Sequence, residues 1–333
     1  MTAIIFIIVL SVIIFVHELG HFVMAKRAGM KVEEFGFGFP PRIWGYKPKD
    51  SETVYSINWI PFGGFVKILG EDGNSDDNRS FTAKNFWPRF KVIVAGVAMN
   101  FIFAVGLFII INLIGSEAKI LITNVAPNSP AQQAGIKVGD VVLGFADVDE
   151  VQKYIGEHKE QEIILQMSRR TIKITPRENP PPGEGAIGIA LAQTEAVSYP
   201  WYEAIWRGIA DAGTAFWSIV VGFITLIKHI ITTGKAGVEL AGPVGIAVIS
   251  GQAARLGFIY LAQFVAFISL NLAVINIVPF PALDGGRLLF LVIEKIKGSP
   301  LPRKLEGAMN MVGFALLLLL MFYITAKDVL KFF

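Results

Sequence analysis

Four long apolar segments, separated by polar stretches, set the pattern of this chain. They cover residues 4–23, 92–114, 258–278 and 309–325. A helix rises about 1.5 Å per residue, so roughly 17 to 25 apolar residues cross the hydrocarbon core of a bilayer. No small-residue cleavage site follows the first segment, which argues against an export signal. The pattern predicts an α-helical polytopic membrane protein with four transmembrane helices.

A fifth segment, residues 201–231, is harder to interpret. Its uncharged part, residues 212–227, is shorter than a full span and is flanked by Arg207, Asp211 and Lys228. Charges at both ends of a short apolar stretch favour amphipathic helices that lie in the membrane interface. A fifth crossing would also reverse the side of every later segment.

Basic residues indicate the orientation of the chain. The segment between the first two spans, residues 25–91, holds eleven lysines and arginines, and the link between the last two spans holds five more. Basic loops tend to stay in the cytoplasm. With four spans both loops fall on the cytoplasmic side, so both termini face outward.

Residues 117–178, between the second and third spans, have a different character. Short apolar stretches such as 120–125 and 163–167 alternate there with turn residues and charges, which predicts a small α+β domain outside the membrane. The run from Asn179 to Gly183 contains three prolines and marks a boundary. The predicted parts are two helices with a cytoplasmic loop (1–115), an extracytoplasmic domain (116–185), a linker with interfacial helices (186–255) and two final helices (256–333).

Composition supports a membrane protein and excludes several kinds of site. The 333 residues are 53% hydrophobic and only 17% charged, which is too apolar for an ordinary soluble enzyme. The net charge is only +3, and the basic residues form no face that would follow nucleic acid. Cysteine is absent, so a transition metal would need histidine, aspartate or glutamate ligands.

The first apolar segment contains the sequence His17-Glu18-Leu19-Gly20-His21. Histidines four residues apart share one face of a helix and can bind one zinc ion, with Glu18 beside them as a general base. An ionisable group at membrane depth costs about 2.5 to 3.5 kcal/mol, so three polar groups together need a compensation such as a metal. The alternative is a chance pattern, expected in roughly a few per cent of chains of this length.

A catalytic zinc site needs a third protein ligand, and Asp284 is the candidate. It follows the third span, after Pro279 and Pro281, which break the helix and free backbone groups that must line a cavity. The first and third spans both run inward, so His21 and Asp284 can meet near the inner face. The alternative for Asp284 is a helix-end carboxylate beside Arg287.

Together these residues resemble the site-2 protease family of intramembrane zinc metalloproteases, in particular its bacterial branch with an extracytoplasmic PDZ domain, the regulator-of-sigma-E protease type. The resemblance covers nearly the whole chain. It rests on the His17 to His21 motif, Asn276, Pro279, Asp284-Gly285, the stretch from Gly96 to Asn100, and Gly242-Pro243.

The resemblance implies a site and a reaction. His17, His21 and Asp284 would hold Zn²⁺, Glu18 would activate water, and Asn276 would hold the substrate backbone. The substrates would be single-span transmembrane proteins, such as anti-sigma factors or remnant signal peptides, cut as the second step of regulated intramembrane proteolysis. The protein would lie in the bacterial inner membrane in contact with lipid, with its active site near the cytoplasmic face.

The family also has a membrane-associated β-hairpin in the first cytoplasmic loop. Here residues 54–60 and 62–67 fit two strands around a glycine turn. A substrate could pair with the edge at Gly63, Gly64 and Phe65, which would keep its peptide bonds unwound. Alternatively, the hairpin only seals the cytoplasmic mouth.

The outer domain carries a pattern similar to the PDZ domains of bacterial proteases, over residues 125–131 and 134–140. It has room for one such domain, whereas some relatives have two. The domain would either block substrates with large outer parts or bind an extended peptide end.

Other polar residues have structural interpretations. Gly96 and Ala95 favour close helix packing, with Asn100 as an interhelical hydrogen bonder. His158 and His229 are read as ordinary polar residues. Three other functions fit the residues less well. A prenyl-protein processing type of zinc protease would have glutamate rather than Asp284 as its third ligand, a non-catalytic membrane adaptor would have no need of Glu18, and a zinc transporter would need a second relay of carboxylates across the membrane.

Overall fold

The computed structural model describes residues 2–71, 75–115, 119–167, 170–181, 183–193, 198–234 and 241–332. Two compact units are present. The first consists of Met1–Ile111 and Ile205–Phe333, and the second of Asn112–Ala204.

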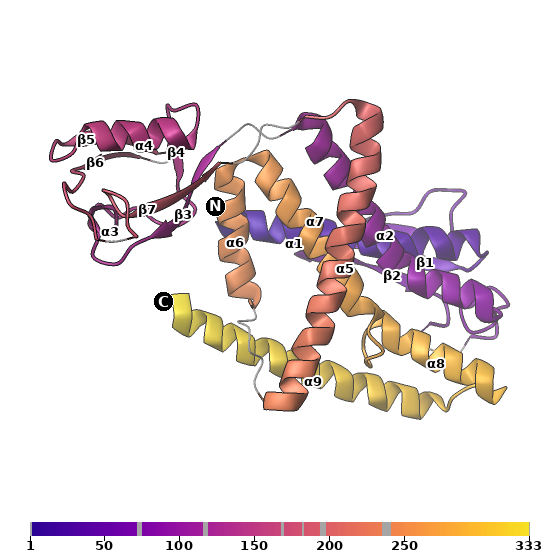
Figure 1. Cartoon of the computed structure of the whole chain (residues 1–333). Helices are drawn as coiled ribbons and strands as arrows, with labels where there is room; N and C mark the ends of the chain where they lie inside the picture. Colours follow the sequence, from indigo (N-terminus) through magenta and orange to yellow (C-terminus); the bar gives the residue numbers. More distant parts are fainter. Residues whose placement is uncertain are drawn as a thin grey trace. The chain divides into compact units, whose positions relative to one another are not determined.

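The first unit is built mainly from helices (Figure 1). The long ones are α1 (Thr2–Arg27), α2 (Phe86–Ile114), α5 (Trp201–Thr233), α7 (Phe258–Ile277) and α9 (Arg303–Phe332), and the short ones are α6 (Pro243–Leu256) and α8 (Asp284–Lys297). All five long helices are long and apolar enough to cross a membrane. The protein is therefore a helical membrane protein, and the four predicted spans coincide with parts of α1, α2, α7 and α9, the third ending one residue beyond α7.

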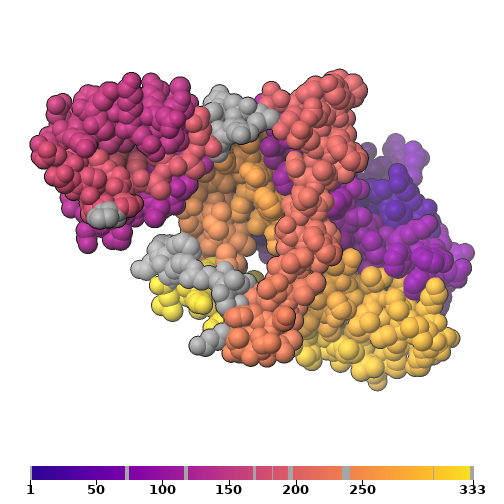
Figure 2. All heavy atoms as spheres, in the orientation of Figure 1, coloured from indigo at the N-terminus to yellow at the C-terminus, as the bar shows by residue number. Residues whose placement is uncertain are grey.

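Helix α5 differs from the prediction of several interfacial helices. It is one continuous helix of 33 residues. The charged residues that flank its apolar part do not interrupt the backbone, because arginine and lysine are good helix formers and no proline lies within the helix. Large apolar side chains remain exposed on it, including Trp217 (65%) and Ile224 (59%), and it runs along the visible surface (Figure 2).

Helices α1 and α2 pack side by side and run in opposite directions. His21 of α1 lies against the carbonyl of Val92, whereas His17, one turn earlier, lies against Asn100, two turns later. Gly20 makes this close approach possible, because a Cβ atom there would lie 2.3 Å from the carbonyl oxygen of Ala95. Small residues of this kind allow helices to pack closely in a membrane.

Helices α1 and α7 run in the same direction. Thr2, at the start of α1, packs on Gly251 in α6, directly before α7. His17, further along α1, lies beside Asn276 near the end of α7. The end of α7 and the beginning of α8 therefore lie at the same level as the second half of α1.

The first loop forms a sheet from β1 (Val32–Tyr46) and β2 (Val54–Ile68). Both strands bend, so Gly36 of β1 pairs with Ser56 on one side and with Phe65 on the other. The two predicted strands thus exist, but they do not form a hairpin with each other, because residues 34–37 lie between them. Among the described residues, the segment 64–67 pairs on one edge only.

The sheet is joined to the helices at one end and exposes apolar side chains at the other. Its base contributes Val32 and Ile68 to a buried cluster with residues of α1, α2 and α8. Trp44 and Trp59 are 55% and 67% exposed. Exposed aromatic side chains of this kind suit contact with lipid.

The second unit is a five-stranded sheet with helices. Its elements are β3 (Ile120–Val125), α3 (Pro130–Gln133), β4 (Val141–Leu143), α4 (Val148–Glu157), β5 (Ile163–Met167), β6 (Thr171–Ile174) and β7 (Ile189–Gln193), with strand order β6-β5-β4-β3-β7. Alternating residues such as Ile163 and Leu165 fill one core beneath α4.

The domain boundary predicted at residue 185 falls inside this unit. Strand β7 lies beyond that residue and pairs with β3, so the proline run is an internal loop rather than a linker. Within that run Pro182 lies outside the described residues, as does residue 116, the predicted start of the domain. The sequence pattern missed β7 because it is short and follows a proline-rich stretch.

Candidate metal centre

Two histidines of α1 face the same point. His17 and His21 are one turn apart, and both are buried, with 6% and 9% of their surface exposed. Their Nε2 atoms are 3.2 Å apart. The i, i+4 spacing expected from the sequence therefore brings both rings together.

Gly96 of α2 makes room for both rings. A Cβ atom at this position would lie 2.4 Å from His21 Nε2 and 2.7 Å from His17 Cε1. The sequence suggested only close packing here. The structure places the bare backbone of Gly96 directly beneath the two histidines.

Hydrogen bonds at the opposite side of each ring define which nitrogen faces the site. His21 Nδ1 lies 2.8 Å from the carbonyl oxygen of Val92, which can only accept, so Nδ1 carries the proton. The Nε2 atom of His21 then has a free lone pair. A ring held in this way is prepared to bind a metal through Nε2.

Asn100 orients the His17 ring in the same way, through its Nδ1 atom. Its side-chain amide lies 3.3 Å from His17 Nδ1, and its Oδ1 atom is buried without a hydrogen-bond partner. The oxygen and nitrogen of an amide are assigned from such contacts, and exchanging them lets Oδ1 accept the Nδ1 proton. The interhelical hydrogen bond predicted for Asn100 is therefore present. Its partner is one of the two site histidines, which the sequence did not indicate.

Asp284 completes the cluster from the first residue of α8. Its Oδ2 atom lies 3.0 Å from His17 Nε2 and 3.3 Å from His21 Nε2. The turn that carries it is tight, since a Cβ atom on Gly285 would lie 2.1 Å from the carbonyl oxygen of Val278. The two glycines after Asp284 thus allow α8 to begin directly against the end of α7.

These three residues fit a metal ion. His17, His21 and Asp284 offer ligand atoms within 4.8 Å of one another. With protons on both Nδ1 atoms, the two Nε2 atoms and Asp284 Oδ2 are all lone-pair donors, and Oδ2 is buried without a hydrogen bond. Three such atoms repel one another unless a cation lies between them. Two nitrogens and one oxygen suit zinc and leave a fourth position for water.

Glu18 and Asn276 border this cluster. The Glu18 carboxylate is half-buried and lies close enough to His21, His17 and Asp284 to interact electrostatically with each. The side-chain amide of Asn276 lies 3.4 Å from His17 Nε2. Glu18, predicted for catalysis, and Asn276, predicted for substrate binding, thus lie beside the three candidate metal ligands.

The predicted strand residues lie one turn away along α1. Gly63 packs on Ile14, where a Cβ atom would come within 2.5 Å of the Ile14 side chain, and its N–H donates to Ser11 Oγ at 3.3 Å. Gly64 packs on Phe15 and pairs with Phe37, and Phe65 continues the strand. The glycines therefore bring the single-paired edge of β2 close to the helix that carries the histidines.

The sequence model of peptidase family M50 matches residues 5–320. This chain belongs to peptidase family M50. Zinc metalloprotease RasP of Geobacillus kaustophilus is 32% identical to it, with 98% of this chain and 97% of that protein aligned. The regulator of sigma-W protease RasP of Bacillus subtilis is 29% identical, with 100% and 99% aligned. A protein of Clostridium perfringens that is named as a zinc metalloprotease is 38% identical over 96% of both chains.

Family membership over nearly the full length gives the protein its class. It is a membrane zinc metalloprotease of the site-2 protease family. This confirms the predicted enzyme class and the predicted zinc cofactor. The adaptor and transporter interpretations are not supported, because the relatives are named as proteases.

Proposed function

We propose that this M50 protease cuts single-span membrane proteins within the bilayer, with His17, His21 and Asp284 as zinc ligands. The observation that carries the proposal is the buried convergence of these three side chains, two from the apolar helix α1 and one from the turn after the apolar helix α7. Zinc bound there would lower the pKa of a water molecule toward about 7 and polarise the substrate carbonyl.

The neighbouring side chains supply the rest of the chemistry. Glu18 takes a proton from the attacking water and later returns it to the leaving amide nitrogen. The side-chain amide of Asn276 lies 3.4 Å from His17 Nε2 and, in this proposal, hydrogen-bonds the substrate backbone. The edge of β2 from Gly63 to Phe65 pairs with the substrate as an added strand, which keeps the segment unwound so that its peptide bonds are accessible.

Four crossings place this site near the cytoplasmic face of the bacterial inner membrane. The parallel course of α1 and α7 supports this number, because an even number of crossings must separate the end of α2 from the start of α7. Helix α6, with 14 residues, spans about 21 Å and is too short to return a crossing made by α5. Helix α5 would then lie at the membrane without crossing it. The basic first loop sets the cytoplasmic side.

The second unit serves as an extracytoplasmic PDZ-like domain that binds an extended peptide end. A cavity of about 380 Å³ lies between α4 and the segment that leads into and begins β7, lined by Gln152, Ile155, Gly156, Gly185, Ala186, Ile187, Ile189 and Leu191. Among the described strands, β7 pairs only with β3, so its other edge can accept a peptide.

A single substitution separates peptide binding from the size-filter interpretation. Gly156 lines the cavity, and a Cβ atom there would meet no atom within 4 Å, so Gly156→Phe adds an aromatic ring at the cavity wall with no clash at its Cβ. We expect the variant to keep its melting temperature and to lose binding of fluorescent peptides derived from substrate outer segments. Unchanged peptide binding, or no binding by either protein, would favour a purely steric role.

The substrate class rests on the relatives. The name of the Bacillus subtilis protein describes a protease that regulates sigma-W. By extension, the substrates of this chain are anti-sigma-factor-like proteins or remnant signal peptides that another protease has already shortened.

Glu18→Gln provides the decisive test of the proposed mechanism. Purified wild type and variant are reconstituted with a model single-span substrate, and cleavage and zinc content are both measured. We expect equal zinc content and a loss of cleavage of at least about 100-fold, because the amide cannot act as a base. A wild type that binds no zinc would overturn the metal site, and a variant that cuts normally would overturn the role of Glu18.

A further inference from the structure

The turn that carries Asp284 contains a residue in an unusual conformation. Ala282 has a φ of +76°, in the left-handed region that favours glycine. A non-glycine residue keeps this conformation only when surrounding contacts hold it there. Because Ala282 lies two residues before Asp284, its conformation determines where the carboxylate points.

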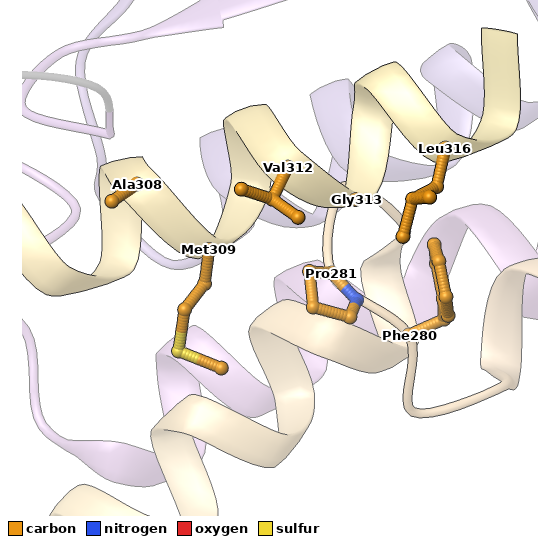
Figure 3. Close-up of a pocket in the computed structure, with 7 residues that line it drawn as sticks. All are labelled: Phe280, Pro281, Ala308, Met309, Val312, Gly313 and Leu316. Atoms are coloured by element: carbon orange, nitrogen blue, oxygen red, sulfur yellow. The ribbon is translucent and has the colours of Figure 1, made fainter. Parts of the chain in front are cut away.

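Helix α9 provides the contacts that hold this turn. The Oδ1 atom of Asn310 accepts a hydrogen bond of 3.1 Å from the backbone N–H of Ala282. One turn later, Gly313 lies directly against the turn, and a Cβ atom there would be 2.5 Å from the carbonyl oxygen of Pro281 (Figure 3). The apolar part of α9 is otherwise mostly exposed, because only 6% of its most apolar 18-residue stretch is buried.

The inner side of the same turn is fixed independently. Gly285 and Gly286 pack on the carbonyl groups of Val278 and Phe280. These contacts hold the start of α8 against the end of α7, and a backbone hydrogen bond of 3.2 Å from the Leu283 N–H to the Phe280 carbonyl closes the turn. The Ala282 N–H takes no part in that bond, and its acceptor comes from α9. Among the described residues, Asn310 is the side chain that hydrogen-bonds this peptide.

We infer that Asn310 and Gly313 are positioning residues, through which α9 holds Ala282 in the left-handed conformation and keeps Asp284 in place as the third zinc ligand. The inference rests on the metal site proposed above. It assigns a role in metal retention to a helix that contributes no ligand. Loss of either contact lets Ala282 relax to negative φ, which turns the Asp284 carboxylate away from the histidines.

The first test compares matched glycines on α9. Gly313→Ala inserts a methyl group between the helix and Pro281, whereas Gly307→Ala adds the same group where no atom lies within 4 Å. Zinc release from the purified full-length protein to a chromogenic chelator is followed by stopped flow. We expect release from Gly313→Ala to be about tenfold faster than from wild type, in the range for lost support of a metal ligand. Gly307→Ala should match wild type.

The second test removes the hydrogen bond without adding bulk. Asn310→Leu should also accelerate zinc release about tenfold. Asn310→Asp keeps an acceptor oxygen and should release zinc at the wild-type rate. Thr325→Val is the control, because Thr325 donates only to Met321 within α9. The double variant Ala282→Gly/Asn310→Leu should release zinc about fivefold more slowly than Asn310→Leu alone, because glycine adopts positive φ without steric cost.

The possible outcomes distinguish this inference from the proposed site. If wild type holds no zinc, the metal site itself is wrong. If wild type holds zinc and both Asn310→Leu and Gly313→Ala release it at the wild-type rate, the positioning role is wrong and the site stands. If the variants release zinc faster but Ala282→Gly recovers nothing, the effect does not pass through the left-handed residue, and the inference is again overturned.

Discussion

Substitution of Gly96 by alanine is the most direct test of how α2 supports the proposed metal ligands. The added Cβ atom would lie 2.4 Å from His21 Nε2, whereas ordinary contacts begin at 3.4 Å, so one of the two must retreat by about 1 Å. If helix α2 moved away instead, it would lose its close packing on Gly20 and its contacts with the Nδ1 atoms of His21 and His17. The histidine ring is therefore the group that shifts.

A shift of this size is large for a metal ligand. Ligand distances in a zinc site hold to within about 0.2 Å, so a 1 Å displacement removes His21 from the coordination sphere. We expect Gly96→Ala to lose most of its bound zinc and at least about 100-fold in cleavage rate. Zinc is measured by atomic emission on the purified protein, and cleavage with a reconstituted single-span substrate.

Gly106 provides the control on the same helix. A Cβ atom there meets no atom within 4 Å, and alanine is the better helix former by about 1 kcal/mol. Gly106→Ala should keep full zinc content and activity. If Gly96→Ala also binds one zinc per chain and cuts at the wild-type rate, the histidines do not lie against α2 as described. Loss of zinc in both variants would mean that any added methyl disturbs the helix, and the local explanation would fail.

Three further predictions concern the ligands and the topology. Asp284→Ala should lower zinc affinity at least about 100-fold while the melting temperature of the zinc-free protein stays near that of zinc-free wild type, as titration with a competing chelator and thermal unfolding will measure. Asn100→Leu should weaken zinc binding about 10- to 100-fold, whereas Asn100→Asp, which keeps an acceptor for His17, should not; equal affinities would remove Asn100 from the site. Because the chain has no cysteine, Thr233→Cys can be labelled alone in intact cells, and it should react with an impermeant reagent if α5 does not cross the membrane. Glu157→Cys should then react as the outer control and Lys297→Cys should not.

The chemical core of the site could be predicted because it depends on local spacing and orientation. The His17 to His21 motif needs only a helix to bring its rings together. Asp284 could be added because the loop charges predict that the first and third spans run in the same direction, and the contact between α1 and the end of α7 agrees with this. Neither step requires knowledge of how the helices are rotated.

The supporting residues could not be predicted, because they depend on rotation and on rare backbone conformations. The rotation of α2 about its own axis determines whether the Asn100 side chain contacts His17 on α1 or a residue of another helix. Pro281 is typical of the position before the left-handed residue of a type II turn, but glycine or asparagine is expected at the left-handed position itself, so the conformation of Ala282 is not predicted. Its contact with Asn310 joins residues from two segments that the sequence treats as independent.

The glycines of this protein show where the backbone must come close and where it need not. Gly20, Gly96, Gly285 and Gly313 each stand where a single methyl group would collide with backbone or with a ligand ring, and all four contacts bear on the histidines or on the turn that carries Asp284. In a membrane, apolar side chains gain little by leaving lipid, so close packing of small residues determines the distance between helices. These glycines thereby set the distances between the side chains of His17, His21 and Asp284. Alanine at any of them should therefore affect zinc retention before it affects folding.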